Sequence, residues 1–192
     1  MVSKSKRIML WLACLIIWPF SIVWIYSSWP MYYQDQLLSV LSFGIVMGIV
    51  AFFPLIVNKT PIFFINGIGF AVFLTYGLLI EVLLTQMALI VVLMRIKIDR
   101  SQGFRIPLNL LMFLFISIFS ATVYKWIGGL HETNHFGSFY NQLQIIGYVV
   151  TFFISNHILL FLLKRFIHQQ KTKFLDEGFV WELITTLIVL PV

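Results

Sequence analysis

The segment His131–His135 reads His-Glu-Thr-Asn-His, and its residue types and spacing are those of a zinc hydrolase. On a helix, the H-E-x-x-H spacing places two imidazoles on one face to ligate zinc, with the glutamate as a general base. Glycines flank the segment on both sides and disfavour a stable helix there. The acidic residue expected on the same side as a third ligand is Asp35, with Glu81 as a second candidate. We therefore expect no metal site, interpret the segment as a solvated or ligand-gating loop, and keep an outer-face metallohydrolase on His131, Glu132 and His135 as an alternative.

Glu81 is the one acidic residue deep in an apolar context, between Ile80 and Val82. An ionisable group in a membrane span is costly, and the default hypothesis for such a group is a functional one. Candidate partners for its carboxyl group are Gln86, Asn66 and Thr75, which are near in sequence, and His157 from a later apolar run. The competing interpretation is a structural glutamate, protonated or hydrogen-bonded at a helix boundary.

Asn156 and His157 lie about two helical turns before Lys164, in the inner half of an apolar run. A histidine there could titrate near neutral pH as a switch or proton carrier, whereas a neutral packing histidine is the competing interpretation. Together with Glu81, Gln86 and Asn66, these two residues are the candidate ligand- or signal-binding residues. The sequence contains no phosphate-binding loop, G-x-S-x-G or C-x-x-C motif, so we expect no cofactor and no catalytic residue, and expect the chain not to be an enzyme.

The composition is that of a membrane protein rather than of a soluble domain. Of the 192 residues, 60% are apolar and 10% charged, and the mean hydropathy is +0.97, whereas a soluble chain is roughly 45–50% apolar and about 25% charged. The formal charge of +6 gathers at the ends of apolar runs, so nucleic acid is not an expected partner. The single cysteine, Cys14, excludes an intrachain disulfide, and we interpret it as a small buried hydrophobe. We predict an all-α, polytopic transmembrane helical bundle.

We expect about six spans, from the apolar runs 8–29, 37–57, 62–96, 106–124 and 144–163, with a partial seventh at 179–192. The run 62–96 is too long for one helix, which would reach about 50 Å, and too short for two full spans of roughly 20 residues each with a turn. We therefore expect a pair of short helices, or a re-entrant hairpin, that folds between Tyr76 and Glu81.

The basic residues favour two crossings by the run 62–96. Two crossings place 12 of the 13 Lys and Arg residues on the cytoplasmic side, whereas one crossing places only five there. We accordingly predict a multi-pass protein of the cell membrane with a cytoplasmic N-terminus. It forms a single integral membrane domain over 1–192, with an extracytoplasmic loop at 125–142 and a cytoplasmic segment at 164–178. Because the last apolar run is short, we expect the amino-terminal part of a longer protein, with a half-helix lying in the membrane interface as the alternative.

Two stretches carry a resemblance to a known family. The first contains Phe53-Pro54, Asn58-Lys59-Thr60-Pro61, Phe73-Leu74-Thr75-Tyr76-Gly77-Leu78-Leu79-Ile80-Glu81 and Thr85-Gln86, and the second contains Asn156-His157, Gly178-Phe179-Val180-Trp181-Glu182-Leu183 and Leu190-Pro191. Together they resemble the multi-span N-terminal membrane sensor regions that precede GGDEF (diguanylate cyclase) output domains in Firmicutes, with a layout similar to five-span LytS-type receptors. The resemblance implies a bacterial signal-input and anchoring module whose cyclase chemistry resides in a cytoplasmic domain further along. The sequence has no GGDEF motif, so no catalytic residue carries over.

The leading interpretation is therefore a membrane-embedded sensory or signal-transduction module that regulates a cytoplasmic output domain. The alternative is a small-molecule transport or substrate-binding subunit, because the size and span number also resemble the six-span vitamin-binding subunits of energy-coupled importers. The lipid bilayer is the expected partner, and a small-molecule ligand and a second copy of the chain in a homodimer remain open. Copurification of a small molecule or of ATPase subunits would favour the transport subunit.

Overall fold

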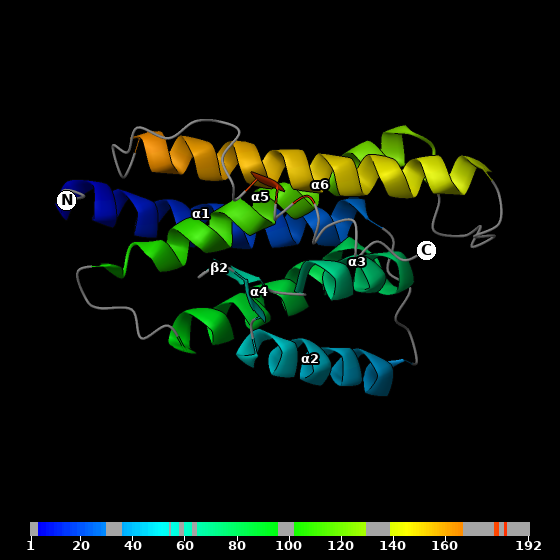
Figure 1. The fold of residues 1–192 in the computed structure, drawn as a ribbon, viewed down its shortest axis with the longest axis horizontal. Helices are drawn as coiled ribbons and strands as arrows, with labels where there is room; N and C mark the ends of the chain where they lie inside the picture. The colour runs from blue at the N-terminus through cyan, green and yellow to red at the C-terminus, as the bar shows by residue number, and fades with distance from the viewer. Residues whose placement is uncertain are drawn as a thin grey trace. The chain divides into compact units, whose positions relative to one another are not determined.

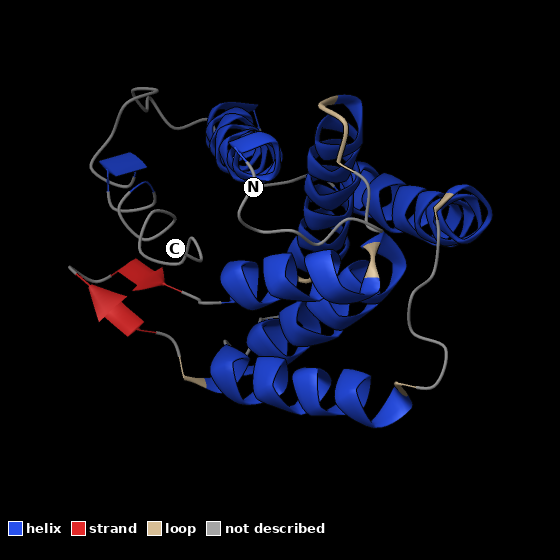
Figure 2. Ribbon diagram, turned by 90° about the vertical axis from the view of Figure 1, so that its right-hand side faces the viewer, coloured by secondary structure: helices blue, strands red, loops and turns tan. Residues whose placement is uncertain are grey.

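The computed structural model describes residues 4–29, 36–53, 55–57, 60–62, 65–95, 102–129, 139–166, 179–180 and 183. These ranges contain six helices and one short antiparallel β-hairpin (Figures 1 and 2). In chain order the elements are α1 (Lys4–Ser28), α2 (Leu37–Phe52), β1 (Leu55–Val57), β2 (Thr60–Ile62), α3 (Ile65–Tyr76), α4 (Leu78–Arg95), α5 (Arg105–Trp126) and α6 (Phe139–Phe166). The predicted all-α fold class is confirmed.

Four of the helices, α1, α4, α5 and α6, are long and apolar enough to cross a membrane. The 18 residues of α4 extend about 27 Å, close to the thickness of a bilayer core. The apolar helices α2 and α3 are shorter, with 16 and 12 residues. The protein is therefore membrane-associated, as its composition predicts.

The chain divides into two compact units, Met1–Leu114 and Phe115–Val192. The first unit contains α1 to α4, the β-hairpin and the first half of α5, and the second contains the rest of α5 and α6. The single membrane domain over 1–192 stays a prediction.

The predicted helical hairpin in the run 62–96 is confirmed, with its turn at Gly77. The amide of Gly77 donates the last hydrogen bond of α3 to the Phe73 carbonyl at 3.0 Å, and the amide of Glu81 donates to the Gly77 carbonyl at 3.2 Å. Gly77 has a φ of 87°, a left-handed conformation that costs residues with a Cβ roughly 1–2 kcal/mol. The glycine therefore ends α3 and lets α4 start one residue later.

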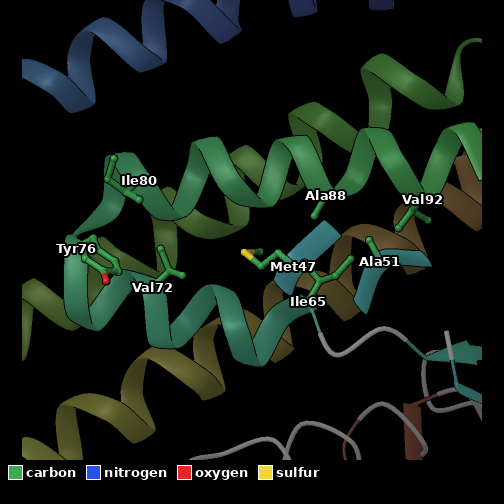
Figure 3. Packing of buried hydrophobic residues seen from close by; sticks show 8 residues of the cluster. All are labelled: Met47, Ala51, Ile65, Val72, Tyr76, Ile80, Ala88 and Val92. Atoms are coloured by element: carbon green, nitrogen blue, oxygen red, sulfur yellow. The ribbon is translucent and has the colours of Figure 1, made fainter. Parts of the chain in front are cut away.

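The core of the first unit lies between α2, α3 and α4 (Figure 3). It contains Met47, Ala51, Ile65, Val72, Tyr76, Ile80, Ala88 and Val92. The Tyr76 ring also makes an edge contact with Phe43, at 5.7 Å between centroids. A Cβ on Gly44 would lie 3.2 Å from Cδ2 of Leu84, so this glycine lets α2 approach α4 closely.

The sequence predicts that the second apolar run is helical from residue 37 to residue 57. This prediction is wrong for its last residues. Helix α2 ends at Phe52, and residues 55–57 form β1, which pairs antiparallel with β2 in the register Leu55↔Ile62, Ile56↔Pro61 and Val57↔Thr60. The physical reason is Pro54, because a proline disfavours the helical conformation of the residue before it. Phe53 accordingly has φ −118° and ψ 74°.

In the second unit, α5 continues beyond the predicted run and ends in a glycine cap. The Gly128 amide donates to the Lys125 carbonyl at 3.0 Å and the Gly129 amide to the Tyr124 carbonyl at 2.9 Å, which is the Schellman arrangement with Gly128 at φ 90°. Because α5 includes Lys125 and α6 starts at Phe139, the connection between these helices is shorter than the predicted loop 125–142. A Cβ on Gly147 would overlap the Ile127 side chain, so α6 packs closely on the end of α5.

Candidate functional site

Helix α4 carries a group of buried polar side chains, Glu81, Thr85 and Gln86, which we name the α4 polar cluster. Their side chains are only 1%, 2% and 4% exposed. Of the four long helices, α4 is also the most buried, at 56% of its span against 11% for α1. Because buried polar groups need hydrogen-bond partners, the contacts of this cluster are the starting point for function.

Glu81 and Thr85 form a hydrogen-bonded pair on one face of α4. They are four residues apart, which places their side chains one turn apart on the same side of the helix. The Thr85 hydroxyl donates to Oε1 of Glu81 at 3.0 Å. Thr75, which is an expected partner of Glu81, instead donates its hydroxyl to the Ala71 carbonyl within α3 at 2.8 Å. The i, i+4 spacing of Glu81 and Thr85 allows this bond, but the spacing alone does not distinguish it from a bond between the Thr85 hydroxyl and its own backbone.

Gly69 of α3 lies opposite this pair. A Cβ on Gly69 would be 3.1 Å from Oγ1 of Thr85 and 3.6 Å from Oε1 of Glu81. The first distance is tighter than ordinary van der Waals contact, so the missing side chain is what makes room for the threonine hydroxyl. The Glu81–Thr85 pair is thus enclosed between α4 and the glycine face of α3.

Gln86 connects α4 with α5 within the first unit. Its Nε2 donates to the main-chain carbonyl of Leu110 at 3.0 Å. Its Oε1 is buried and accepts no hydrogen bond from the described residues. A buried acceptor without a bond costs about 1–3 kcal/mol. This oxygen is therefore a position where a bound hydrogen-bond donor would be stabilised.

The other candidate residues do not join this cluster in the first unit. Asn66 is exposed in the first turn of α3. Asn156 and His157 belong to α6 in the second unit, where both are buried. The His157 ring stacks on Phe153 at 6.4 Å and meets Phe179 edge-on at 4.6 Å between centroids. His157 is thus separate from the α4 polar cluster and packs against aromatic rings.

The three metal candidates, His131, His135 and Asp35, lie outside the described residues. Within the described ranges, no group of three or more His, Cys, Asp or Glu side chains could hold a metal ion. Cys14, the single cysteine, is buried in α1. Among the described residues, the candidate site is therefore the α4 polar cluster. It offers a carboxyl group, a hydroxyl group and an amide, which together can bind a proton, a cation or a hydrogen-bond donor.

Comparisons of the chain with protein-family models, with curated proteins and with solved structures find no match in any of the three.

Proposed function

We propose that the protein is a multi-pass membrane sensory module in which the α4 polar cluster receives the signal. The observation that carries this proposal is the position of the cluster on α4. This helix packs against α1, α2 and α3, and it is hydrogen-bonded to α5 through Gln86 and Leu110. A change in the polar contacts of α4 is therefore transmitted to every other helix of the first unit.

The signal acts by favouring one position of α4 over another. A ligand shifts such an equilibrium only by the difference between its affinities for the two states. Protonation of Glu81 or binding of a donor beside it would change its bond with Thr85 and the fit of both groups against Gly69. Gly77, at the turn between α3 and α4, is the point about which the two helices can change their relative angle.

The resemblance to the sensor regions of GGDEF proteins supports a proposal for the kind of domain that the sensory module regulates. It implies that the helices anchor and regulate a cytoplasmic domain of the diguanylate cyclase type, further along the protein than Val192. In this proposal the present residues contribute no catalytic group.

The basic residues support a cytoplasmic N-terminus. Lys4, Lys6 and Arg7 lie in the first turn of α1, and Arg95 is the last residue of α4. Figure 1 has these two helix ends at the same end of the first unit. Lys and Arg gather on the cytoplasmic side of membrane proteins, so we place this end in the cytoplasm.

The test compares Thr85→Val with the matched control Thr75→Val in cells that make the native full-length protein. Both variants replace a threonine hydroxyl with a methyl group in neighbouring helices, but only Thr85 bonds to Glu81. We expect Thr85→Val to change the cellular cyclic di-GMP concentration several-fold at unchanged membrane abundance, and Thr75→Val to leave it near the wild-type value. Cyclic di-GMP that is unaffected by deletion of the whole gene would exclude this output.

A small-molecule-binding transport subunit is the second candidate, and the buried Oε1 of Gln86 favours it, because a substrate donor could occupy that position. Native mass spectrometry of the purified protein tests this function. A copurified small molecule that is lost on Gln86→Leu, together with unchanged cyclic di-GMP, would favour transport over sensing.

A further inference from the structure

The net charge of the chain is concentrated in two short segments. Residues 1–7 and 95–105 hold seven of the 13 Lys and Arg residues and one of the seven Asp and Glu residues, namely Asp99. These segments therefore carry a formal charge equal to the +6 of the entire chain, and the remaining basic and acidic residues cancel. Positive charges that are concentrated in this way create a positive electrostatic potential around the segments that carry them.

The described basic residues of both segments belong to helix ends on the same side of the first unit. Helix α1 begins at Lys4, α4 ends at Arg95 and α5 begins at Arg105, and Figure 1 has all three helix ends on the side where the chain starts. Lys4, Lys6 and Arg95 are exposed, and Arg7 and Arg105 are half-buried. We name these five residues the basic end. Glu81, the acidic residue of the first unit that the structure describes, lies 14 positions before Arg95, about 21 Å along α4.

Arg95 has a defined position at the basic end. The carbon of its guanidinium group lies 5.3 Å from the centroid of the Phe52 ring, a cation–π contact between the last residues of α4 and α2. A guanidinium group has five N–H donors, which can donate hydrogen bonds to an anion.

Exposed apolar side chains are next to these charges in the sequence. Ile8 and Met9 follow the basic residues of α1, Met94 precedes Arg95, and Phe53 follows Phe52. A small soluble anion would gain no binding energy from these apolar side chains. A phospholipid would contact them with its acyl chains while its phosphate group meets the basic residues.

We propose that the basic end is a binding site for an anionic phospholipid of the leaflet it faces. The phosphate group is held by Arg95 and Arg105 with help from the first turn of α1, and the acyl chains lie against the exposed apolar residues next to them. The site requires membrane association but not a sensory role, so its failure would leave the proposed function unaffected. Its effect would be to fix the depth and tilt of α1, α4 and α5 according to the lipid composition.

The experiment titrates the purified full chain in detergent with phosphatidylglycerol and with phosphatidylcholine of the same acyl chains, and counts bound lipid by native mass spectrometry. We expect the wild-type protein to bind phosphatidylglycerol more tightly, with an affinity that falls at high salt. Removal of one basic residue weakens binding to an anionic leaflet about fivefold, so Arg95→Gln with Arg105→Gln should weaken phosphatidylglycerol binding about 25-fold and leave phosphatidylcholine binding unchanged.

Two control variants keep the test specific. Lys125→Gln removes an exposed charge from the other end of α5, and Arg165→Gln removes an arginine that also lies over a phenylalanine, at 6.0 Å from the Phe161 ring. Both should bind phosphatidylglycerol within about twofold of the wild type. If the double variant unfolds by circular dichroism, Arg95→Gln alone serves in its place, with an expected fivefold loss. Equal affinity for the two lipids, or an equal loss in the controls, would overturn the site. So would soluble glycerol phosphate that binds as tightly as the lipid.

Discussion

Thr85 donates a 3.0 Å hydrogen bond to Oε1 of Glu81, one turn earlier in α4, at a point where α3 presents a glycine. Both side chains are nearly fully buried, at 2% and 1% exposure. The threonine hydroxyl fixes one carboxyl oxygen, and Gly69 provides the space. The interaction therefore depends on three residues of two helices, and each can be tested by substitution.

Glu81→Gln should be tolerated better than Glu81→Leu. Glutamine has the size of glutamate and keeps an oxygen that can accept the Thr85 hydroxyl, whereas leucine accepts no hydrogen bond and places a branched carbon near Gly69. We expect a loss of about 1–3 kcal/mol in the free energy of unfolding for Glu81→Leu and of less than about 1 kcal/mol for Glu81→Gln. Thermal unfolding in detergent measures both, and equal stabilities would show that the carboxyl group has no structural role in the cluster.

Gly69→Ala and Gly48→Ala form a matched pair in short apolar helices. The new methyl group at position 69 would lie 3.1 Å from Oγ1 of Thr85, whereas at position 48 it meets nothing within 4 Å. We expect Gly69→Ala to destabilise the protein by about 1–3 kcal/mol through overpacking, and Gly48→Ala to be neutral or to stabilise by up to about 1 kcal/mol, because alanine is the better helix former.

A second substitution identifies the cause of the Gly69→Ala effect. Thr85→Ala removes the hydroxyl that the new methyl group would crowd, so the double variant should be more stable than the sum of the two single losses predicts. Additive losses in thermal unfolding would argue against direct contact between positions 69 and 85.

The sequence identifies the hairpin of α3 and α4 because length arithmetic is a strong constraint in a membrane: 35 apolar residues fit neither one span nor two. It also identifies Glu81, since a carboxyl group in an apolar run is rare for energetic reasons. It does not identify Thr85, because a threonine in a helix usually bonds to its own backbone, as Thr75 does. The importance of Gly69 depends on which face of α3 meets α4, which only the packed helices reveal.

The β-hairpin at 55–62 illustrates a different limit. Its first strand, residues 55–57, continues the apolar run of α2 without a break in hydropathy, so the composition of these residues favours an extension of α2. Pro54 is the local signal that separates helix α2 from strand β1. It acts through the backbone conformation of Phe53 rather than through polarity. Hydropathy thus locates the apolar run, while backbone stereochemistry decides where its helix ends.

His157 in the second unit is tested by substitutions that separate packing from polarity. Its ring contacts Phe153 and Phe179, so His157→Phe keeps the aromatic contacts, whereas His157→Ala removes them. If the residue has a packing role, the alanine variant should lose about 2–4 kcal/mol of unfolding free energy and the phenylalanine variant less than half of that. Equal losses would instead assign the stabilisation to the polar atoms of the imidazole.

Membrane topology is tested by reporter fusions in the full chain. Because α3 and α4 form a hairpin, fusions after Arg100 and after Lys171 should both report the cytoplasm, and a fusion after His135 should report the outside. The paired use of an alkaline phosphatase and a fluorescent protein gives opposite signals on the two sides and controls for expression. An outside location for Arg100 would mean that the segment from Ile62 to Ile96 crosses only once. With a cytoplasmic N-terminus, that outcome would also place Lys4, Lys6 and Arg7 on the other side of the membrane from Arg95 and Arg105, and would overturn the proposed lipid site.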